Sequence, residues 1–207
     1  MRRFLAVEFA TTIRHDGHGG VTDELATPEA LAEWLAERAD IFSPPLDVEA
    51  THCDDALLAE VVELRRAVRA LFARAVRPGP PSPADAHRLL PMEEAMARLN
   101  AAVAREPITL RLEWPDGQPP SASPESSTED QRIRLVAALA RSTTAFLTGP
   151  FRERLRACTA PRCVRYFVQG HGRQEWCKPS CANRARAARY YERQRSVRAG
   201  RDGAADS

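Results

Sequence analysis

Residues 51–76, THCDDALLAEVVELRRAVRALFARAV, contain the longest helical pattern of apolar side chains in the sequence. The apolar positions recur at steps of three and four, which places them on one face of an α-helix: Leu57, Val61, Leu64, Val68, Leu71, Phe72 and Ala75. The stretch therefore predicts the longest helix of a fold that is mainly α, with a small β component.

A second helix is predicted over residues 27–39, TPEALAEWLAERA. Thr27 suits the N-cap, and Pro28 suits the first helical position, where a backbone N–H is not needed. The face expected to be buried comprises Leu31, Trp34 and Leu35. Upstream, residues 4–13 (FLAVEFATTI) fit either a helix or a strand, and residues 14–20 (RHDGHGG) are expected to form a loop.

A third helix is expected to begin at Ser82 and Pro83 and to run to residue 105. Pro91 lies inside this stretch. Because proline lacks a backbone N–H and its ring clashes with the preceding turn, it can break the helix there.

A fourth helix, residues 128–148, is expected to connect the N-terminal part to the C-terminal part. Thr128 and Gln131 fit a capping box at its start, and Gly149-Pro150 fit its end. The face expected to be buried comprises Ile133, Val136, Ala137, Ala140 and Phe146.

One segment alternates apolar and polar residues, which is typical of a half-buried strand. It is ITLRLEW, residues 108–114, with Ile108, Leu110, Leu112 and Trp114 at alternate positions. A lone strand is not stable, so it must pair with another segment, either residues 4–9 or one near 118–122. Residues 115–127 are rich in Pro, Ser and Gly and are expected to form a turn followed by a flexible linker or surface loop.

Charge divides the chain into two parts, although the net charge is only +2. Residues 151–201 carry 14 basic and three acidic residues, whereas residues 1–150 carry 16 arginines and 23 acidic residues. An acidic N-terminal part is thus joined to a strongly basic C-terminal part, which points to a polyanionic partner for the latter.

The basic part contains four of the five cysteines, spaced C-x4-C-x13-C-x3-C: Cys158, Cys163, Cys177 and Cys181. Two close pairs joined by a short insert suit one tetrahedral zinc ion, and four filled ligand positions predict a structural site. The alternatives are ordinary buried thiols, a redox pair, an iron–sulfur cluster, or His171 in place of one cysteine. Cys53, the fifth, is expected to fill space in a helix.

The residues around the cysteines predict a small finger, residues 151–198, that is treble-clef-like or ββα, with a hairpin followed by a helix. VRYFVQ and RQEW (164–169 and 173–176) are expected to form the hairpin, with Phe167 and Trp176 packed over the metal. Ser180 is expected to cap the helix and to place Cys181 in its first turn. Metal binding would supply stability that so small a core lacks, and residues 199–207 are expected to be disordered.

The helix after Cys181 predicts a nucleic-acid contact surface. Its basic and polar residues, with two that precede it, are Arg173, Lys178, Asn183, Arg184, Arg186, Arg189 and Arg193. Arginine suits phosphates and guanine edges, and asparagine suits adenine, so the expected partner is double-stranded DNA. The alternatives are RNA, a solvated arginine-rich helix, and a protein-interaction module that docks on an acidic surface, including that of residues 1–150.

Other functions find less support in the sequence. The loop residues His15, Asp16, His18 and Asp23 could bind a metal, but a polar surface loop is the simpler interpretation. There is no nucleophile elbow, phosphate loop or dinucleotide fingerprint, so we do not expect an enzyme. No apolar run is long enough to span a bilayer. We expect a cytoplasmic protein without membrane contact, which could form a homo-oligomer, with any small-molecule ligand of the N-terminal part unknown.

The chain also resembles a known family. Cys158, Cys163, Phe167, Trp176-Cys177 and the tetrapeptide from Cys181 to Arg184 resemble the CGNR zinc finger, a bacterial module. VEFATT (7–12) and DELATPEALAEWL (23–35) resemble two segments of the ABATE domain, which would then occupy residues 1–150.

The resemblance implies a regulator of stress-induced transcription, with a helical N-terminal domain and a DNA-binding finger that holds zinc through the four cysteines. The sequence departs from the family pattern at three places. Ala182 replaces the motif glycine, Thr11 stands where asparagine is frequent, and the arginines before Trp176 are reduced to Arg173. The last departure implies weaker phosphate contacts.

Overall fold

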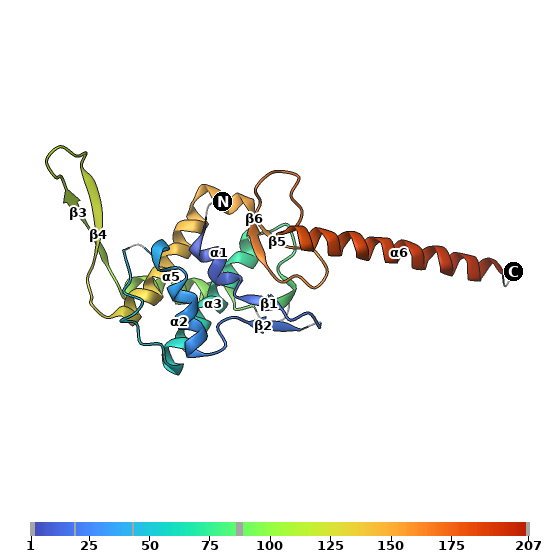
Figure 1. The fold of residues 1–207 in the computed structure, drawn as a ribbon, viewed down its shortest axis with the longest axis horizontal. Helices are drawn as coiled ribbons and strands as arrows, with labels where there is room; N and C mark the ends of the chain where they lie inside the picture. The colour runs from blue at the N-terminus through green and yellow to red at the C-terminus, as the bar shows by residue number, and fades with distance from the viewer. Residues whose placement is uncertain (1–2, 19, 43, 86–88, 206–207) are drawn as a thin grey trace.

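The computed structural model describes the chain apart from residues 1–2, 19, 43, 86–88 and 206–207, and for residues 196–205 it describes the backbone alone. Helices make up most of this part of the chain (Figure 1): α1 (Leu5–Ala10), α2 (Pro28–Ala36), α3 (Asp55–Ala75), α4 (Met92–Ala104), α5 (Gln131–Thr148) and α6 (Pro179–Ala205). The strands form antiparallel pairs: β1 (Ile13–His15) with β2 (Val21–Asp23), β3 (Ile108–Glu113) with β4 (Ser121–Ser126), and β5 (Leu155–Ala157) with β6 (Tyr166–Val168). The expectation of a mainly α protein with a small β component is confirmed.

Helix α3 lies at the centre of the body, where it contacts α1, α2, α4 and α5. Asp54 caps it by accepting a hydrogen bond from Leu57 N at 2.8 Å. The predicted apolar face is buried from Leu57 to Phe72, and Ala75 packs against the same core while remaining partly exposed. Burial of each leucine or phenylalanine contributes about 1.5–3 kcal/mol, so this face organises the core.

Helix α2 forms as its sequence predicts. The Thr27 side chain accepts a hydrogen bond from Ala30 N at 3.2 Å, and Pro28 is the first helical residue. The predicted buried face, Leu31, Trp34 and Leu35, faces the core.

Two predicted helix starts are wrong. Helix α4 begins at Met92, directly after Pro91, whereas Ser82 leads only into a short 3-10 turn, η2 (Pro83–Asp85); residues 86–88 of the predicted helix lie outside the described residues. Helix α5 is capped by Asp130, which accepts hydrogen bonds from two N–H groups of the first turn, and not by Thr128. Pro91 breaks the first predicted helix, as the sequence allowed. At the second, the Asp130 carboxylate lies nearer the first turn than the Thr128 hydroxyl and caps the helix in its place.

The N-terminal residues adopt both of the forms that the sequence allowed. Residues 4–13 divide into helix α1 and the start of β1. The stretch 14–20, expected as a loop, contributes its first residues to β1, and the β1–β2 pair places Ile13 opposite Asp23.

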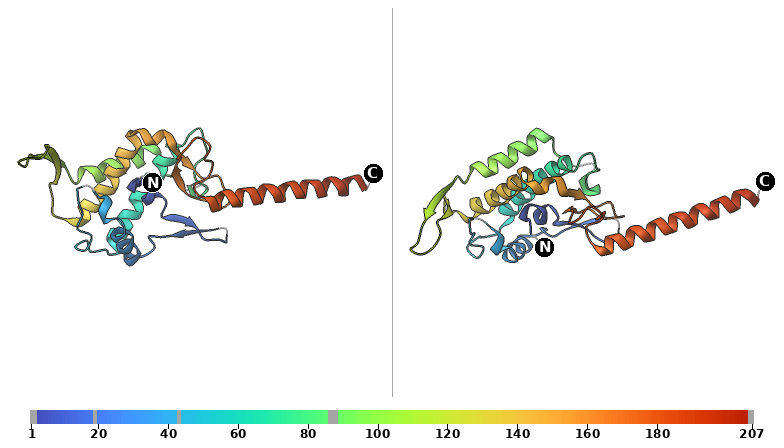
Figure 2. Two further views of the ribbon diagram at one scale, coloured as in Figure 1. Left: turned by 45° about the horizontal axis from the view of Figure 1, so that its top comes forward. Right: turned by 90° about the horizontal axis from the view of Figure 1, so that it is seen from above.

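Strands β3 and β4 form an arm that projects from the body (Figures 1 and 2). Strand β3 pairs with a segment that overlaps the 118–122 alternative, and β4 occupies the second half of the predicted linker. The expectation of a half-buried strand is wrong, because one face of the arm is apolar yet exposed. Leu110, Leu112 and Trp114 are 74%, 70% and 69% exposed. Alternation shows that a segment is two-faced, but it does not show that anything covers the apolar face.

Helix α6 extends from the opposite side of the body (Figures 1 and 2). Its 27 residues span about 40 Å at about 1.5 Å per residue. The tail expected to be disordered from residue 199 continues this helix to Ala205. Among the described residues, no helix combines the length and the apolar character that crossing a membrane requires.

The exposed arm predicts a contrast in stability. Replacing Leu110, Leu112 and Trp114 together by serine should change the free energy of unfolding by no more than about 0.5 kcal/mol, because these side chains leave water only slightly on folding. Leu57→Ala in α3 is the control and should cost about 2–5 kcal/mol. Urea denaturation followed by circular dichroism measures both, and a loss for the triple variant comparable to that of Leu57→Ala would show that the arm packs on the body.

Candidate zinc centre and basic helix

Three segments bring the four cysteines together. Cys158 directly follows β5, Cys163 lies before β6 in the connection between the two strands, and Cys177 lies in the loop before α6. Cys181 lies in the first turn of α6, where its N–H donates to Lys178 O at 3.0 Å. The helix begins at Pro179, so the expected cap at Ser180 is wrong: proline takes the first helical position, where it needs no N–H partner.

The hairpin of the finger differs from the predicted one. Strand β6 pairs with β5, which places Phe167 opposite Arg156, and does not pair with residues 173–176. The latter residues form a loop, in which Gln174 accepts a hydrogen bond from Gly170 N at 2.6 Å. Leu155 of β5 is buried in the main core, so packing outside the cysteine segment selects the pairing.

The sulfur atoms have the spacing that one zinc ion needs. All four Sγ atoms lie within 4.8 Å of one another. The Cys163–Cys177 and Cys177–Cys181 distances are 3.7 and 3.5 Å. Four thiolates at about 2.3 Å from a tetrahedral zinc ion lie about 3.8 Å apart. The residues therefore fit the metal, with Cys158, Cys163 and Cys181 buried and Cys177 partly buried.

Two of the four sulfurs accept hydrogen bonds from nitrogen donors. Arg184 Nη2 lies 3.3 Å from Cys181 Sγ, and Cys177 N donates to Cys158 Sγ at 3.5 Å. Hydrogen bonds from Cys163 and Cys177 lower the pKa of the Cys158 thiol. His171, the alternative ligand, is exposed and lies outside the four-sulfur group.

A small apolar cluster surrounds the sulfurs. It contains Phe167, Ala160 and Ala185, with Trp176 packed against it while partly exposed. The Arg189 guanidinium lies 5.4 Å from the centre of the Trp176 ring, so the first turns of α6 are held against the cluster by Trp176 as well as by Cys181.

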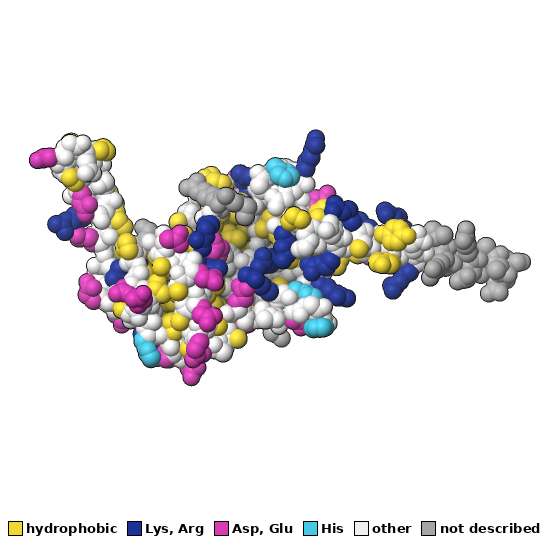
Figure 3. Space-filling model, in the orientation of Figure 1, with side chains coloured by type: hydrophobic (Ala, Val, Ile, Leu, Met, Phe, Trp, Pro, Cys, Tyr) yellow, Lys and Arg dark blue, Asp and Glu magenta, His cyan; other side chains and the backbone are white. Residues whose placement is uncertain are grey.

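The residues predicted to contact nucleic acid are all exposed: Arg173, Lys178, Asn183, Arg184, Arg186, Arg189 and Arg193. Their described polar contacts are local. Arg186 Nη2 donates to Asn183 Oδ1 at 2.6 Å, and Arg189 Nη2 lies 3.6 Å from Glu175 Oε2. Figure 3 shows Lys and Arg side chains gathered over the finger and α6, and acidic side chains over the remainder of that face. The basic helix thus points away from the acidic part of its own chain.

A buried polar network, which the sequence reasoning missed, fastens the finger to the body. Arg69 of α3 donates from Nε and Nη2 to Asp85 at 2.7 and 3.0 Å, and from Nη1 to Ala10 O at 2.5 Å. Tyr166 of β6 donates to Asp85 Oδ2 at 2.7 Å. Burial and the charge of Asp85 raise the pKa of Tyr166, so its hydroxyl remains a neutral donor.

Ser82 extends the network into the finger. Its hydroxyl donates to Val164 O at 2.8 Å, and its N–H donates to the phenol oxygen (Oη) of Tyr166 at 3.3 Å. The Tyr166 ring also packs edge-on against Phe72, with ring centres 5.6 Å apart. One signal for this network was present in the sequence: Arg69 lies on the buried face of α3, one position after Val68.

Other residues singled out in the sequence have structural partners. Asp23 accepts hydrogen bonds from Arg65 Nη1 and Nη2 at 2.6 and 2.5 Å. Asp16 Oδ1 accepts from His18 N at 2.7 Å, and His15 Nδ1 accepts from Gly17 N at 2.7 Å. Among the described residues, only the four cysteines form a group that could hold a metal ion. Cys53 precedes α3, so its expected place in a helix is wrong, but it packs against the core as expected, where burial raises the pKa of its thiol.

The sulfur geometry predicts about one zinc ion per chain. Elemental analysis of the zinc-replete full chain should find it, and Cys181→Ala should abolish it. Cys53→Ala is the matched control and should retain the metal. Chelation should lower the melting temperature of the wild type and of Cys53→Ala, since metal binding adds to folding stability. A zinc content unchanged by Cys181→Ala would refute the assignment.

The polar network predicts a large effect at Asp85. Asp85→Asn leaves the buried Arg69 without a counter-charge and should lower the free energy of unfolding by about 3–5 kcal/mol. Tyr166→Phe removes two hydrogen bonds, one donated to Asp85 and one accepted from Ser82 N, and should cost about 1–3 kcal/mol. Asp116→Asn, in an exposed turn, is the control and should have no measurable effect. Urea denaturation measures all three, and equal values for Asp85→Asn and Asp116→Asn would contradict the network.

Comparison with known families agrees with this geometry. The ABATE family, described as "Putative stress-induced transcription regulator", matches residues 4–150, and the CGNR zinc finger matches residues 154–194. Neither description is that of an enzyme, and no curated protein matches the chain. The resemblance noted in the sequence is thereby confirmed, and the chain belongs to the ABATE family and carries a CGNR zinc finger after its ABATE domain.

Proposed function

We propose that the protein is a zinc-dependent transcription regulator whose finger contacts double-stranded DNA through α6. The observation that carries the proposal is the position of the basic helix. Arg184, Arg186, Arg189 and Arg193 are exposed. They lie on the helix that begins at the four-sulfur centre and points away from the acidic body.

The charge distribution supports a polyanion as the partner. Residues 151–201 hold 14 basic residues against three acidic ones, and the acidic residues of the chain concentrate in the body. An α-helix fits the major groove of B-DNA, where arginine forks can bind phosphates on either side and guanine edges within. The acidic body is repelled by the same phosphates, so contact is confined to the finger.

Zinc would act on DNA binding indirectly. Cys181 lies in the first turn of α6, so a bond from its sulfur to the metal would fix the direction in which the helix leaves the finger. The four cysteines would fill every ligand position of a tetrahedral zinc ion and leave none for a reacting water. Because the site needs reduced thiolates and the partner is DNA, we place the protein in the cytoplasm.

Salt dependence tests this function. Fluorescence anisotropy with genomic DNA fragments should give a log affinity that falls linearly with log salt concentration, because binding releases counter-ions. Replacing Arg184, Arg186, Arg189 and Arg193 by alanine should weaken binding by at least about tenfold and reduce the slope by about 3.6 if each contacts one phosphate.

A charge-matched variant is the control for this experiment. It carries alanine in place of four exposed arginines outside the finger, Arg66, Arg74, Arg77 and Arg111, and should retain the wild-type slope. Equal slopes for the two variants would refute the proposed contact surface. A clear preference for RNA over duplex DNA of the same sequence would instead assign the helix to RNA.

A further inference from the structure

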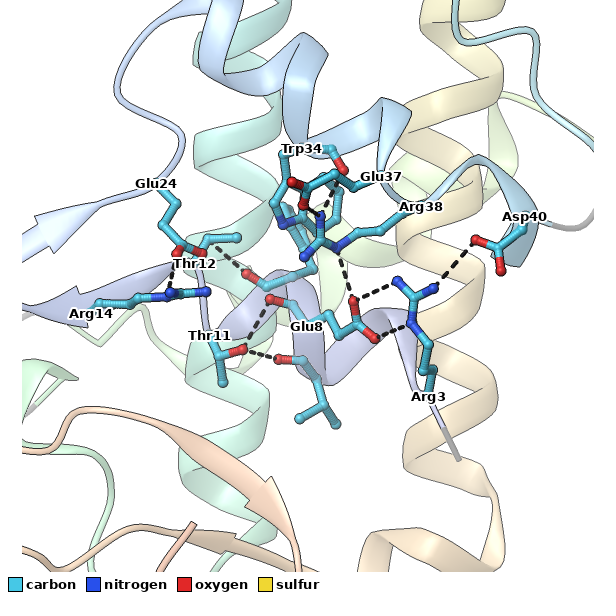
Figure 4. Close-up of polar contacts among 12 residues, drawn as sticks. Arg3, Glu8, Thr11, Thr12, Arg14, Glu24, Trp34, Glu37, Arg38 and Asp40 are labelled. Carbon is cyan, nitrogen blue, oxygen red and sulfur yellow. Dashed lines mark hydrogen bonds and ion pairs between the residues drawn. The ribbon is translucent and has the colours of Figure 1, made fainter. Parts of the chain in front are cut away.

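A cavity of about 480 Å³ lies where helix α1 faces the finger. One wall comes from α1 and the residue before it, through Phe4, Val7 and Glu8. The other comes from the finger, through residues 165–170 and Cys177, and from the turn that precedes β5. This volume is typical of sites for small organic ligands. Figure 4 shows the α1 side, where Glu8 lies between Arg3 and Arg38.

The apolar part of the wall is largely aromatic. Phe4 of the α1 wall contacts Phe151 of the other wall, with ring centres 4.8 Å apart, and Phe167 belongs to the same wall as Phe151. Val7 and Val168 complete this surface. Flat aromatic walls favour a ligand that contains a ring, because ring faces and edges pack against each other at such distances.

The single carboxylate of the wall is already neutralised. Glu8 accepts hydrogen bonds from Arg3 Nε at 2.9 Å and Nη2 at 3.1 Å, and from Arg38 Nε at 2.9 Å. Burial alone would raise the pKa of Glu8, but Arg3 and then Arg38 outweigh it, and the net pKa lies below its usual value. Glu8 therefore stays ionised and paired with arginine, and it leaves no unmatched negative charge for a cation.

Two further arginines line the cavity without a carboxylate partner among the described residues. Arg154 donates to Gln169 O at 2.7 Å and to Gly170 O at 2.5 Å, which fixes its position but does not cancel its charge. Arg165 is half-buried, and in the described part of the chain its guanidinium has neither a hydrogen bond nor an ion pair. Arginine forks bind carboxylates in bidentate geometry, so the Arg165 guanidinium can bind the carboxylate of a ligand in the cavity.

We propose that this cavity binds a small aromatic carboxylate, with the carboxylate at Arg165 and the ring between the aromatic walls. The proposal goes beyond the DNA-binding function and does not depend on it. Because Phe167 also packs against the sulfur cluster and Cys177 belongs to it, the ligand would contact residues that hold the metal as well as the ABATE domain.

The test uses calorimetric titration of the zinc-loaded full chain with 1-naphthoate, benzoate and indole-3-acetate. At least one of the three should saturate with one site per chain, and 1-naphthalenemethanol, which is neutral, should bind at least about tenfold more weakly than 1-naphthoate, since charged hydrogen bonds are the stronger ones. Arg165→Gln should weaken carboxylate binding at least about tenfold.

Matched variants separate the site from general charge effects. Arg152→Gln removes an exposed arginine of the preceding turn that does not line the cavity, and it should bind within about twofold of wild type. Val7→Phe fills the cavity and should also weaken binding while Arg165 remains. The absence of saturation by all three acids up to about 5 mM, equal binding of the neutral analogue, or wild-type affinity in Arg165→Gln would overturn the proposal. If the chain binds naphthoate but not DNA, the proposed ligand site stands and only the proposed DNA-binding function fails.

Discussion

The buried ion pair between Arg69 and Asp85 is the interaction on which the arrangement of the molecule depends. A charged guanidinium in the core is tolerated only when its donors are matched. The matching groups come from segments far apart in the chain: Ala10 at the end of α1, Ser82 just before η2, Asp85 in η2, and Val164 in the finger. Each segment must therefore be in place for the others to be stable. The finger is held to the body by this requirement as well as by apolar packing, so it is not a module on a flexible tether.

The sequence predicted those features that depend on one continuous pattern. The apolar face of α3 and the cysteine spacing each lie within one short stretch, so local reasoning was sufficient. The β5–β6 pairing was missed because Leu155, which is buried in the main core, lies outside the cysteine segment. The β3 strand was recognised, but its exposure depends on the absence of a covering element, which alternation cannot report. Arg69 was missed because arginine is exposed in most proteins, and the partners that allow its burial lie in distant segments of the chain.

The sulfur cluster and the basic charge have separate roles in the C-terminal part. Cys181 places the first turn of α6 in the sulfur cluster. The acidic side chains gather over the body, so a polyanion would be repelled there. A finger that had the same arginines but lacked the cluster would carry the same charge, but the direction of α6 would not be fixed. The cavity beside β6 adds a third element, because Phe167 belongs to its wall and to the cluster around the sulfurs.

Helix α6 differs from the other helices in what maintains it. Among its described side chains, Ala185 is the last that is buried, and those of residues 186–195 are exposed or partly so. These turns depend on intrinsic helix propensity, which alanine favours, while Arg189 and Arg193 lie four residues apart and repel each other. Such repulsion weakens as ions screen it. The helical stability of these exposed turns of α6 therefore depends on the salt concentration, whereas the stability of the body depends on its buried core.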